Sequence, residues 1–263
     1  MTTFMFWNLV EVSREVRQGD ETHWHQQGAV VRNHHPQVLA ITEGWEWHRD
    51  EQALLHRART EFGYDHAELY ASKTGCNMAV MWRDGITLET VYRQPQELAF
   101  WHGFMRVDLN LPDSERPFSL VVSHMNPFDP TLRRIEGSWL RQRLPATGHG
   151  ALVMDANCIP PGDPEPAWSP TRVLPGEEVC DRAPLQTLAD VGLVDVGASR
   201  GDRTPTAGYF NGDDFRSGPQ VRIDQAWVTP SVTIKDYRVI DSTEVDPDID
   251  TASDHRPIWF ETA

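Results

Sequence analysis

Short, strongly apolar runs recur along the chain, and they constrain the fold more than any other feature. FMFWNLV (4–10), QVLAITE (37–43) and GALVMDAN (150–157) are dense in branched and aromatic residues, as buried strands are. Further strand-like runs are HAELYAS (66–72), NMAVMWR (77–83), ITLETVYR (86–93), FMRVDLNL (104–111), FSLVVSH (118–124), QVRIDQAWV (220–228) and a final run from Pro257 to Phe260. Helical patterns alternate with these runs, which indicates an α/β fold. We expect a four-layer α/β sandwich, in which two packed mixed β-sheets are flanked by helices.

Helix and turn signals lie between the strands. The predicted helices span 28–36, 51–63, 130–144 and 185–192. Asp129 is placed to cap the third of these, and Pro130 occupies its first position, where proline is favoured. Glycine-containing pairs at 74–75 and 84–85 are typical of tight turns, so we expect the three strands between 66 and 93 to be antiparallel neighbours.

The length and composition favour one domain over residues 1–263. The segment 159–184 contains seven prolines and little periodicity, so we expect a long surface loop there rather than a linker. No run reaches the roughly 18 apolar residues that a membrane span needs, and the N-terminal residues lack the basic start of a signal peptide. We therefore expect a soluble, cytoplasmic protein. The three cysteines are widely separated and form no C-x-x-C pair, which argues against disulfides and a structural zinc site.

Five of these strand-like runs end in, or contain, a polar residue that a buried strand has no packing reason to hold, and a sixth such position lies just before the final run. These residues are Asn8, Glu43, His124, Asp155 with Asn157, Asp224, and the closing pair Asp254 and His255. A buried carboxylate is costly unless it is paired or bound to a metal ion. Six such positions in one chain predict a shared site at one edge of the sheets.

Each position also has a simpler interpretation. Asn8 is compatible with a strand-end hydrogen-bonder, Glu43 with a helix cap or a surface acid, and His124 with a structural histidine. Asp224 has a competing partner in Arg222, because residues two apart on a strand share a face. The segment ASDHRPIWF (252–260) taken alone is compatible with an ordinary polar turn.

The motifs, in their order along the chain, resemble the endonuclease/exonuclease/phosphatase superfamily. They are WNL at 7–9, ITEG at 41–44, SHMN at 123–126, MDAN at 154–157, RID at 222–224 and SDHRP at 253–257. The resemblance implies a four-layer α/β sandwich that hydrolyses phosphoester bonds with Mg²⁺ or a similar divalent ion such as Mn²⁺. It also implies that Glu43 is a direct metal ligand, supported by Asn8 and Asp254, which suits a hard cation that prefers oxygen.

The same resemblance implies roles for the other residues. Asp155 would orient and deprotonate the attacking water, and Asn157 would donate hydrogen bonds to the phosphate oxygens. His255, bonded to Asp224, would stay protonated and stabilise the phosphoryl oxygens. His124 matches a histidine that some branches use as a second phosphate contact or general acid.

The charge balance narrows the substrate class. The chain has 24 Lys and Arg against 39 Asp and Glu, a formal net charge of −15, and such a field repels polyanions. We therefore expect a phosphorylated small or medium organic molecule as substrate, with no partner protein implied. The first alternative is a nuclease of the same fold, which a basic strip leading into the cleft would support. Its candidate residues are Arg133, Arg134, Arg141, Arg143, Arg172, Arg203 and Arg216. The second alternative is an inactive member that serves as a binding module.

The ten tryptophans bear on the same question. Trp24, Trp45, Trp47, Trp101 and Trp168 fall in or beside the expected loops. Core packing is the simpler expectation for any one of them. Two or more exposed around the site would favour a ring-bearing organic substrate, because aromatic faces stack on rings.

Overall fold

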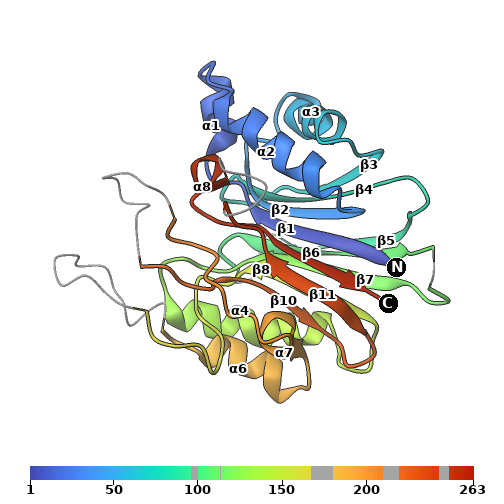
Figure 1. Ribbon diagram of the computed structural model, residues 1–263, viewed down its shortest axis with the longest axis vertical. Helices are drawn as coiled ribbons and strands as arrows, with labels where there is room; N and C mark the ends of the chain where they lie inside the picture. The colour runs from blue at the N-terminus through green and yellow to red at the C-terminus, as the bar shows by residue number, and fades with distance from the viewer. Residues whose placement is uncertain (96–99, 113, 167–179, 210–218, 243–248) are drawn as a thin grey trace.

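Two six-stranded β-sheets pack face to face, and helices cover their outer faces (Figure 1). The structure, a computed structural model, describes residues 1–95, 100–112, 114–166, 180–209, 219–242 and 249–263. Two mixed sheets with helices outside each make four layers. The predicted four-layer α/β sandwich is therefore confirmed.

The first sheet has the strand order β11-β12-β1-β2-β4-β3. Its strands are β1 (Thr2–Asn8), β2 (Val38–Trp45), β3 (His66–Tyr70), β4 (Cys76–Trp82), β11 (Ile234–Val239) and β12 (Ile258–Thr262). β1 and β2 are parallel, and the other neighbouring pairs are antiparallel. The C-terminal ends of β1 and β2 therefore meet the beginnings of β12 and β4 at one edge of the sheet.

The second sheet has the strand order β5-β6-β7-β8-β10-β9. Its strands are β5 (Thr87–Arg93), β6 (Gly103–Asn110), β7 (Phe118–His124), β8 (Gly150–Asp155), β9 (Val194–Asp195) and β10 (Asp224–Val228). β7 and β8 are parallel, whereas β6 and β10 run antiparallel to them. The ends of β7 and β8 thus lie beside the beginnings of β6 and β10.

The helices form the two outer layers (Figure 1). Those beside the first sheet are α1 (Val12–Arg17), α2 (Thr22–His34), α3 (Ala53–Glu61), which follows a 3₁₀ turn η1 (Asp50–Gln52), and α8 (Ile249–Ala252). Those beside the second sheet are α4 (Pro130–Arg143), α6 (Ala183–Asp190) and α7 (Val196–Ser199). As predicted, the Asp129 side chain caps α4 by accepting hydrogen bonds from the first backbone N–H groups. Within the described ranges, none of the helices combines the length and apolarity that a membrane crossing requires.

Three apolar clusters fill the spaces between the four layers. Along β1, Phe4 and Phe6 join the cluster between the sheets, whereas Met5 and Trp7 join the cluster under α2 and α3. Successive strand residues point to opposite faces, and both faces of β1 are covered. This double burial explains why β1 is a continuous apolar run in the sequence rather than an alternating one.

Two predicted elements differ most from the structure at their beginnings. α2 begins at Thr22 rather than at Gly28, because its first half buries Trp24 and the polar Gln27 instead of an apolar stripe. The Gln27 amide donates to the carbonyl of Leu9, so the burial is compensated by a hydrogen bond. The strand predicted over 220–228 begins only at Asp224.

The predicted run of three antiparallel neighbours is wrong in its second half. β3 pairs with β4 as expected, but the turn at 84–85 carries the chain from one sheet to the other, and β5 pairs with β6 instead. Sequence analysis also does not predict β11, an edge strand with mostly exposed or half-buried side chains. The predicted surface loop 159–184 includes residues 167–179, which lie outside the described residues.

Candidate active site

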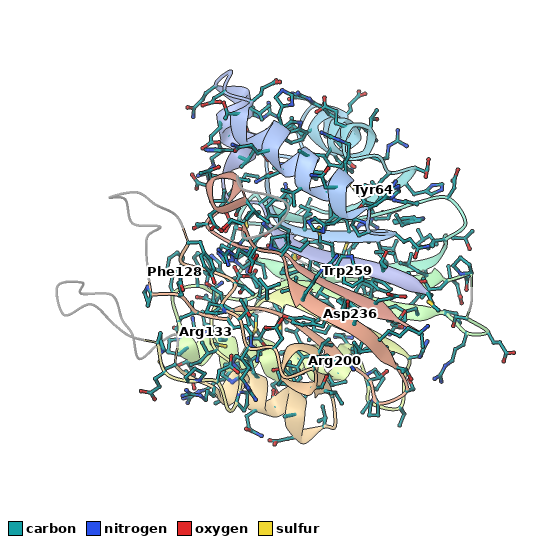
Figure 2. All side chains as sticks on the ribbon, viewed as in Figure 1. Tyr64, Phe128, Arg133, Arg200, Asp236 and Trp259 are labelled. Carbon is teal, nitrogen blue, oxygen red and sulfur yellow. The ribbon has the colours of Figure 1, made fainter. Side chains whose placement is uncertain are left out.

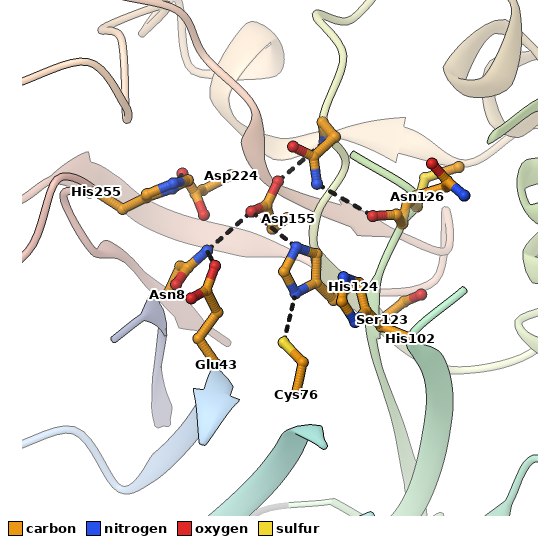
Figure 3. A network of polar contacts seen from close by, with 12 residues as sticks. Asn8, Glu43, Cys76, His102, Ser123, His124, Asn126, Asp155, Asp224 and His255 are labelled. Atoms are coloured by element: carbon orange, nitrogen blue, oxygen red, sulfur yellow. Dashed lines mark hydrogen bonds and ion pairs between the residues drawn. The ribbon is translucent and has the colours of Figure 1, made fainter. Parts of the chain in front are cut away.

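The predicted site residues lie where strand ends from both sheets meet. Asn8, His124 and Asp155 are the last residues of β1, β7 and β8, and Asp224 is the first residue of β10. Asp155 pairs in register with His124 on one side and with Asp224 on the other. Figure 3 shows how the side chains from the two sheets converge on Asp155.

The C-terminal motif SDHRP is fastened to the end of β1. Trp7 Nε1 donates to the carbonyl of His255 at 2.8 Å, and Ser253 Oγ donates to the carbonyl of Asn8 at 2.8 Å. Arg256 points elsewhere: its guanidinium makes two 2.7 Å hydrogen bonds to Asp250. The serine and arginine of the motif therefore hold the chain, while the aspartate and histidine between them face the cleft.

Glu43 reaches the site through an irregularity in β2. The pairing with β4 shifts register between Ile41 and Gly44, and Glu43 has a left-handed backbone with φ of 59°. Bulges and left-handed non-glycine residues are costly and often re-aim a side chain at a functional site. Asn8 Nδ2 donates to Glu43 Oε1 at 3.1 Å, and Trp45 Nε1 donates to Glu43 Oε2 at 3.0 Å.

Several carboxylates meet here with little compensation. Burial raises the pKa of Glu43 to about 7, the charge of nearby Asp254 adds to the rise, and the hydrogen bonds from Trp45 and Asn8 oppose it. Asp254 Oδ1 is buried and finds no hydrogen-bond partner among the described residues, and the same holds for Asp224 Oδ1. An unpartnered buried carboxylate oxygen is costly, and a bound cation is one way to satisfy it.

Asp155 is held by hydrogen bonds from two directions. Asn8 Nδ2 donates to its Oδ2 at 2.9 Å, and the backbone N–H of Asn157 donates to its Oδ1 at 2.9 Å. Asn8 thus bridges Asp155 and Glu43, while its own Oδ1 accepts from the backbone of Val10. Asn157 has a left-handed backbone, and its Nδ2 donates to the carbonyl of Met125 at 3.1 Å.

His255 and Asp224 form a buried pair. His255 Nδ1 donates to Asp224 Oδ2 at 2.7 Å. Burial alone would lower the pKa of His255, but the charge and hydrogen bond of Asp224 hold it well above its usual range. His255 is therefore an imidazolium at neutral pH, and Nε2 remains as a second donor. Asp224 does not pair with Arg222, so the competing interpretation of this aspartate is wrong.

His124 behaves differently. Its Nε2 lies 3.3 Å from Asp155 Oδ2, and its Nδ1 lies 3.5 Å from Cys76 Sγ. Burial and then the nearby charge of His255 lower its pKa to about 3, whereas burial holds the pKa of the Cys76 thiol well above its usual range. The consistent arrangement is a neutral imidazole that accepts from the thiol and donates to Asp155.

Cys76 and His102 are cleft residues that the sequence analysis missed. With His124 they place possible ligand atoms within 4.8 Å of one another. However, the rings of His102 and His124 stack with centroids 4.2 Å apart and planes 26° apart, so one ion cannot lie in the plane of both unless a ring rotates. We assign no metal to this cluster. Both residues stand at strand beginnings, so a search of beginnings as well as ends would have found them.

These groups line a cleft of about 910 Å³. Of the eight predicted site residues, Glu43, His124, Asp155, Asn157, Asp254 and His255 line it directly. Asn8 and Asp224 lie behind them and bond to lining residues. Among the described residues that line the cleft, five are carboxylates and Arg14 is the single lysine or arginine.

The basic strip that would support a nuclease is not found where the structure describes it. Arg133 is buried, Arg134 pairs with Asp181, and Arg203 pairs with Asp163. Arg141 and Arg143 do not line the cleft. Arg172 and Arg216 lie outside the described residues.

The tryptophans divide into two groups. Trp24 and Trp47 are buried in the core under the helices, as the simpler expectation has it. Trp45 and Trp101 line the cleft, and Trp101 is 40% exposed. Trp168 lies outside the described residues.

Comparisons with known proteins agree on the fold. The sequence model described as the "Endonuclease/Exonuclease/phosphatase family" matches residues 26–255. Among curated protein sequences, none matches the chain. Solved structures resemble it at low identity, which bears on the fold alone.

Three of these structures illustrate the range of proteins that share this fold. An endonuclease/exonuclease/phosphatase from Beutenbergia cavernae has a TM-score of 0.69 at 19% identity, and the match covers 99% of this chain and 71% of that one. A mannosyl-6-phosphatase of Bacteroides thetaiotaomicron has a TM-score of 0.64 at 14% identity over the full length of both chains (100% and 100%). TDP2 of D. rerio, complexed with single strand DNA product, has a TM-score of 0.69 at 14% identity, covering 100% of this chain and 98% of that one.

Proposed function

Because the chain belongs to the endonuclease/exonuclease/phosphatase family, we propose that it is a divalent-metal-dependent hydrolase of a phosphomonoester or phosphodiester bond. Its substrate is a small or medium organic phosphate, and water is the attacking group. The observation that carries this proposal is the meeting of Glu43, Asp155, Asp254 and His255 in one cleft, with one Asp254 oxygen buried and unpartnered.

Mg²⁺, or Mn²⁺ in its place, would be held by Glu43 and Asp254, with Asn8 in support. Glu43 and Asp254 offer carboxylate oxygens, which suit a hard cation, and Asn8 orients Glu43 by donating from Nδ2. The unpartnered Oδ1 of Asp254 and the raised pKa of Glu43 fit a cation that compensates both. When bound, the ion supplies positive charge against the phosphoryl group.

Asp155 acts as the general base. Its two oxygens are fixed by Asn8 and by the backbone of Asn157, so the carboxylate is oriented before substrate arrives. It accepts a proton from water, and the resulting hydroxide attacks phosphorus as the P–O bond to the alcohol breaks; the departing alcohol oxygen takes up a proton from solvent. Such a base typically contributes about 10²–10⁴-fold.

Two donors face the phosphoryl oxygens. The Nε2–H of the His255 imidazolium stabilises the negative charge that develops on them, and Asp224 keeps that imidazole oriented and protonated. Asn157 donates through Nδ2. His124, neutral because its pKa is about 3, has a single N–H, which donates to Asp155, so it orients the general base rather than acting as a general acid.

The charge of the cleft favours a small organic phosphate over nucleic acid. Binding to a nucleic acid draws on many lysine or arginine contacts to phosphates, and the described lining offers Arg14 against five carboxylates. An inactive binding module is disfavoured because every residue required by the motif is present and all are brought together.

A substrate panel tests the proposal. p-Nitrophenyl phosphate, bis-p-nitrophenyl phosphate, single-stranded DNA and duplex DNA are incubated with Mg²⁺, with Mn²⁺ and with EDTA. We expect hydrolysis of at least one nitrophenyl ester, lost in EDTA, at a rate above that on either DNA. Faster cleavage of DNA would support the nuclease alternative, and no turnover of any substrate with any divalent ion would remove the enzymatic proposal.

Two variants locate the activity. Glu43→Gln should abolish the binding of Mn²⁺ measured by calorimetry, since it removes a proposed ligand. Asp190→Asn is the matched control: Asp190 is exposed at the end of α6 and bonds to Gln186, so this variant should bind Mn²⁺ and turn over substrate like the parent protein.

A further inference from the structure

Two exposed aromatic side chains stand together at the mouth of the cleft. Trp101 is 40% exposed and Phe128 is 66% exposed, and their rings meet edge to face with centroids 5.7 Å apart. Figure 2 shows Phe128 at the margin of the molecule. Both residues line the cleft that holds Asp155 and His255. Exposed apolar side chains that adjoin one another commonly mark a binding surface.

The backbones of these two aromatic residues are fixed by one buried carboxylate. Glu136 of α4, fully buried, accepts the backbone N–H of Trp101 at 2.8 Å and that of Asn126 at 2.7 Å. The side chain of Asn126 in turn accepts the backbone N–H of Phe128 at 2.7 Å. Burying a carboxylate is costly, and here it joins the segment before β6 to the segment before α4. The aromatic pair is therefore held in place from behind.

A third aromatic side chain, Trp45 at the end of β2, also lines the cleft. The guanidinium of Arg14 covers the ring of Trp45 at 4.0 Å from its centroid. Trp45 Nε1 donates to Glu43, so this ring is tied directly to the proposed metal ligand. We call Trp45, Trp101 and Phe128 the aromatic rim.

The rest of the cleft restricts what the rim can bind. Its volume of about 910 Å³ lies within the roughly 300–1,000 Å³ of sites for drug-sized ligands. The carboxylates of its lining outnumber its one arginine among the described residues, so further phosphates on the substrate would be repelled. Space, aromatic faces and negative charge together favour a body that is flat and carries no negative charge.

We propose that the aromatic rim binds an uncharged aromatic ring in the alcohol portion of a singly phosphorylated substrate. This inference rests on the proposed phosphoesterase function and names its substrate class. The ring contacts Trp101 and Phe128 while the phosphate lies at Asp155 and His255. Aromatic contacts of this kind typically change binding by about tenfold.

Paired probes test the ring preference without relying on turnover. Benzylphosphonate and ethylphosphonate carry the same headgroup and resist hydrolysis, so calorimetry in MnCl₂ compares their binding directly. Turnover is then compared for 2-phenylethyl phosphate and ethyl phosphate, and for their methyl diesters. We expect the phenyl compound of each pair to be favoured by about tenfold or more, in dissociation constant and in kcat/KM.

Variants assign the preference to the rim. Trp101→Leu and Phe128→Leu should reduce the phenyl-to-ethyl ratio by severalfold each, whereas Trp101→Phe should keep most of it because a ring remains. Tyr92→Ala is the matched control, since Tyr92 is an aromatic side chain of similar exposure (36%) on β5 that does not line the cleft. Each variant is checked for folding by its thermal midpoint.

The outcomes separate the two proposals. Turnover of the esters without a phenyl preference, or a preference that both leucine variants retain, overturns the rim assignment and leaves the phosphoesterase intact. Binding of benzylphosphonate with loss of preference in the variants, but no turnover of any ester, supports the rim and contradicts the proposed reaction.

Discussion

The molecule contains two groups of largely buried charges, and they are compensated in opposite ways. The Arg222 network consists of Arg222, Asp163, Asp195 and Arg203, and the cleft cluster consists of Glu43, Asp155, Asp224, Asp254 and His255. In the network, the buried Arg222 guanidinium makes two hydrogen bonds to each aspartate at 2.7–2.9 Å. In the cluster, four carboxylates share one imidazolium.

This difference separates a structural centre from a reactive one. Every charge in the Arg222 network has an opposite charge in contact, so it holds the chain before β10 to the segments that carry Asp163 and Asp195. The cleft cluster keeps excess negative charge beside a cavity. Burial raises the pKa of Glu43 to about 7, and one oxygen each of Asp224 and Asp254 has no partner among the described residues. Such under-compensation is costly to folding and suits the binding of a cation.

The largest effect that we predict is on activity. Asp155→Asn should lower kcat by roughly 10²–10⁴-fold, because it removes the proposed general base. The free energy of unfolding should fall by less than about 1 kcal/mol, since the change also removes one of several like charges. Steady-state kinetics and urea denaturation measure the two quantities on the same preparation. A variant that unfolds much more easily, or one that retains full kcat, would contradict the distinction between the two groups of charges.

The opposite result is expected for the Arg222 network. Arg222→Met keeps most of the side-chain volume but leaves Asp163 and Asp195 buried without their main partner, which should cost roughly 3–5 kcal/mol of unfolding free energy. Arg200→Met is the control, because Arg200 is exposed and, among the described residues, its guanidinium donates to the Lys235 carbonyl alone; this variant should change stability by about 0.5 kcal/mol or less. Urea denaturation decides the case. If Arg222→Met lowered the free energy of unfolding no more than Arg200→Met does, the network would add nothing to stability.

The fold was more predictable than the connections within it. Strands that are buried on both faces, such as β1 and β8, appear in the sequence as unbroken apolar runs, so their position follows from the sequence. The pairing of the strands does not follow from the sequence. The turn at 84–85 looks like a hairpin, yet it joins strands of different sheets, because the partner of β5 is chosen by long-range packing that no local pattern contains.

The site was predictable for a different reason. Polar residues at the ends of apolar runs mark the sheet edge, and the structure gathers all eight predicted residues there; their roles remain predictions. The sequence could not reveal Cys76, His102 or the support of the rim by Glu136, because each depends on a contact across at least 28 residues. Nor did it show that Arg222 belongs with Asp163 and Asp195 rather than with Asp224.

Glu136 is intermediate between the two groups, since it is a buried carboxylate held by backbone donors. Burial raises its pKa to about 7 from an ordinary 4.5. A carboxyl with a raised folded pKa binds its proton more tightly when folded, so its cost to stability is absent below pH 4.5 and grows as the pH rises through 7. At 1.36 kcal/mol for each pKa unit, that cost is at most roughly 3 kcal/mol.

The matched comparison is Glu136→Gln at pH 5 and pH 8. The stability of the variant relative to the parent protein should improve toward pH 8, because glutamine does not ionise and the parent alone bears the growing cost. Urea denaturation at both pH values measures the difference. An equal difference at the two pH values would show that Glu136 titrates in the folded protein as it does in the unfolded chain.

The smallest effect that we predict is the stabilisation of the folded protein by a metal ion. It measures directly how poorly the carboxylates of the cleft cluster are compensated without the ion. If Glu43 and Asp254 are poorly compensated without an ion, Mn²⁺ at a hundred times its dissociation constant should stabilise the folded protein by about 2.7 kcal/mol. Glu43→Gln and Asp254→Asn should each remove most of this gain. Asp236→Asn on the edge strand β11 should keep it, because Asp236 is exposed and, within the described part of the chain, its side chain bonds only to its neighbour Tyr237 (Figure 2). We expect no stabilisation by Mn²⁺ at the Arg222 network, since its carboxylates are already paired. If Mn²⁺ still stabilised the Glu43→Gln and Asp254→Asn variants, the ion would bind elsewhere, and the proposed difference between the two groups of charges would be contradicted.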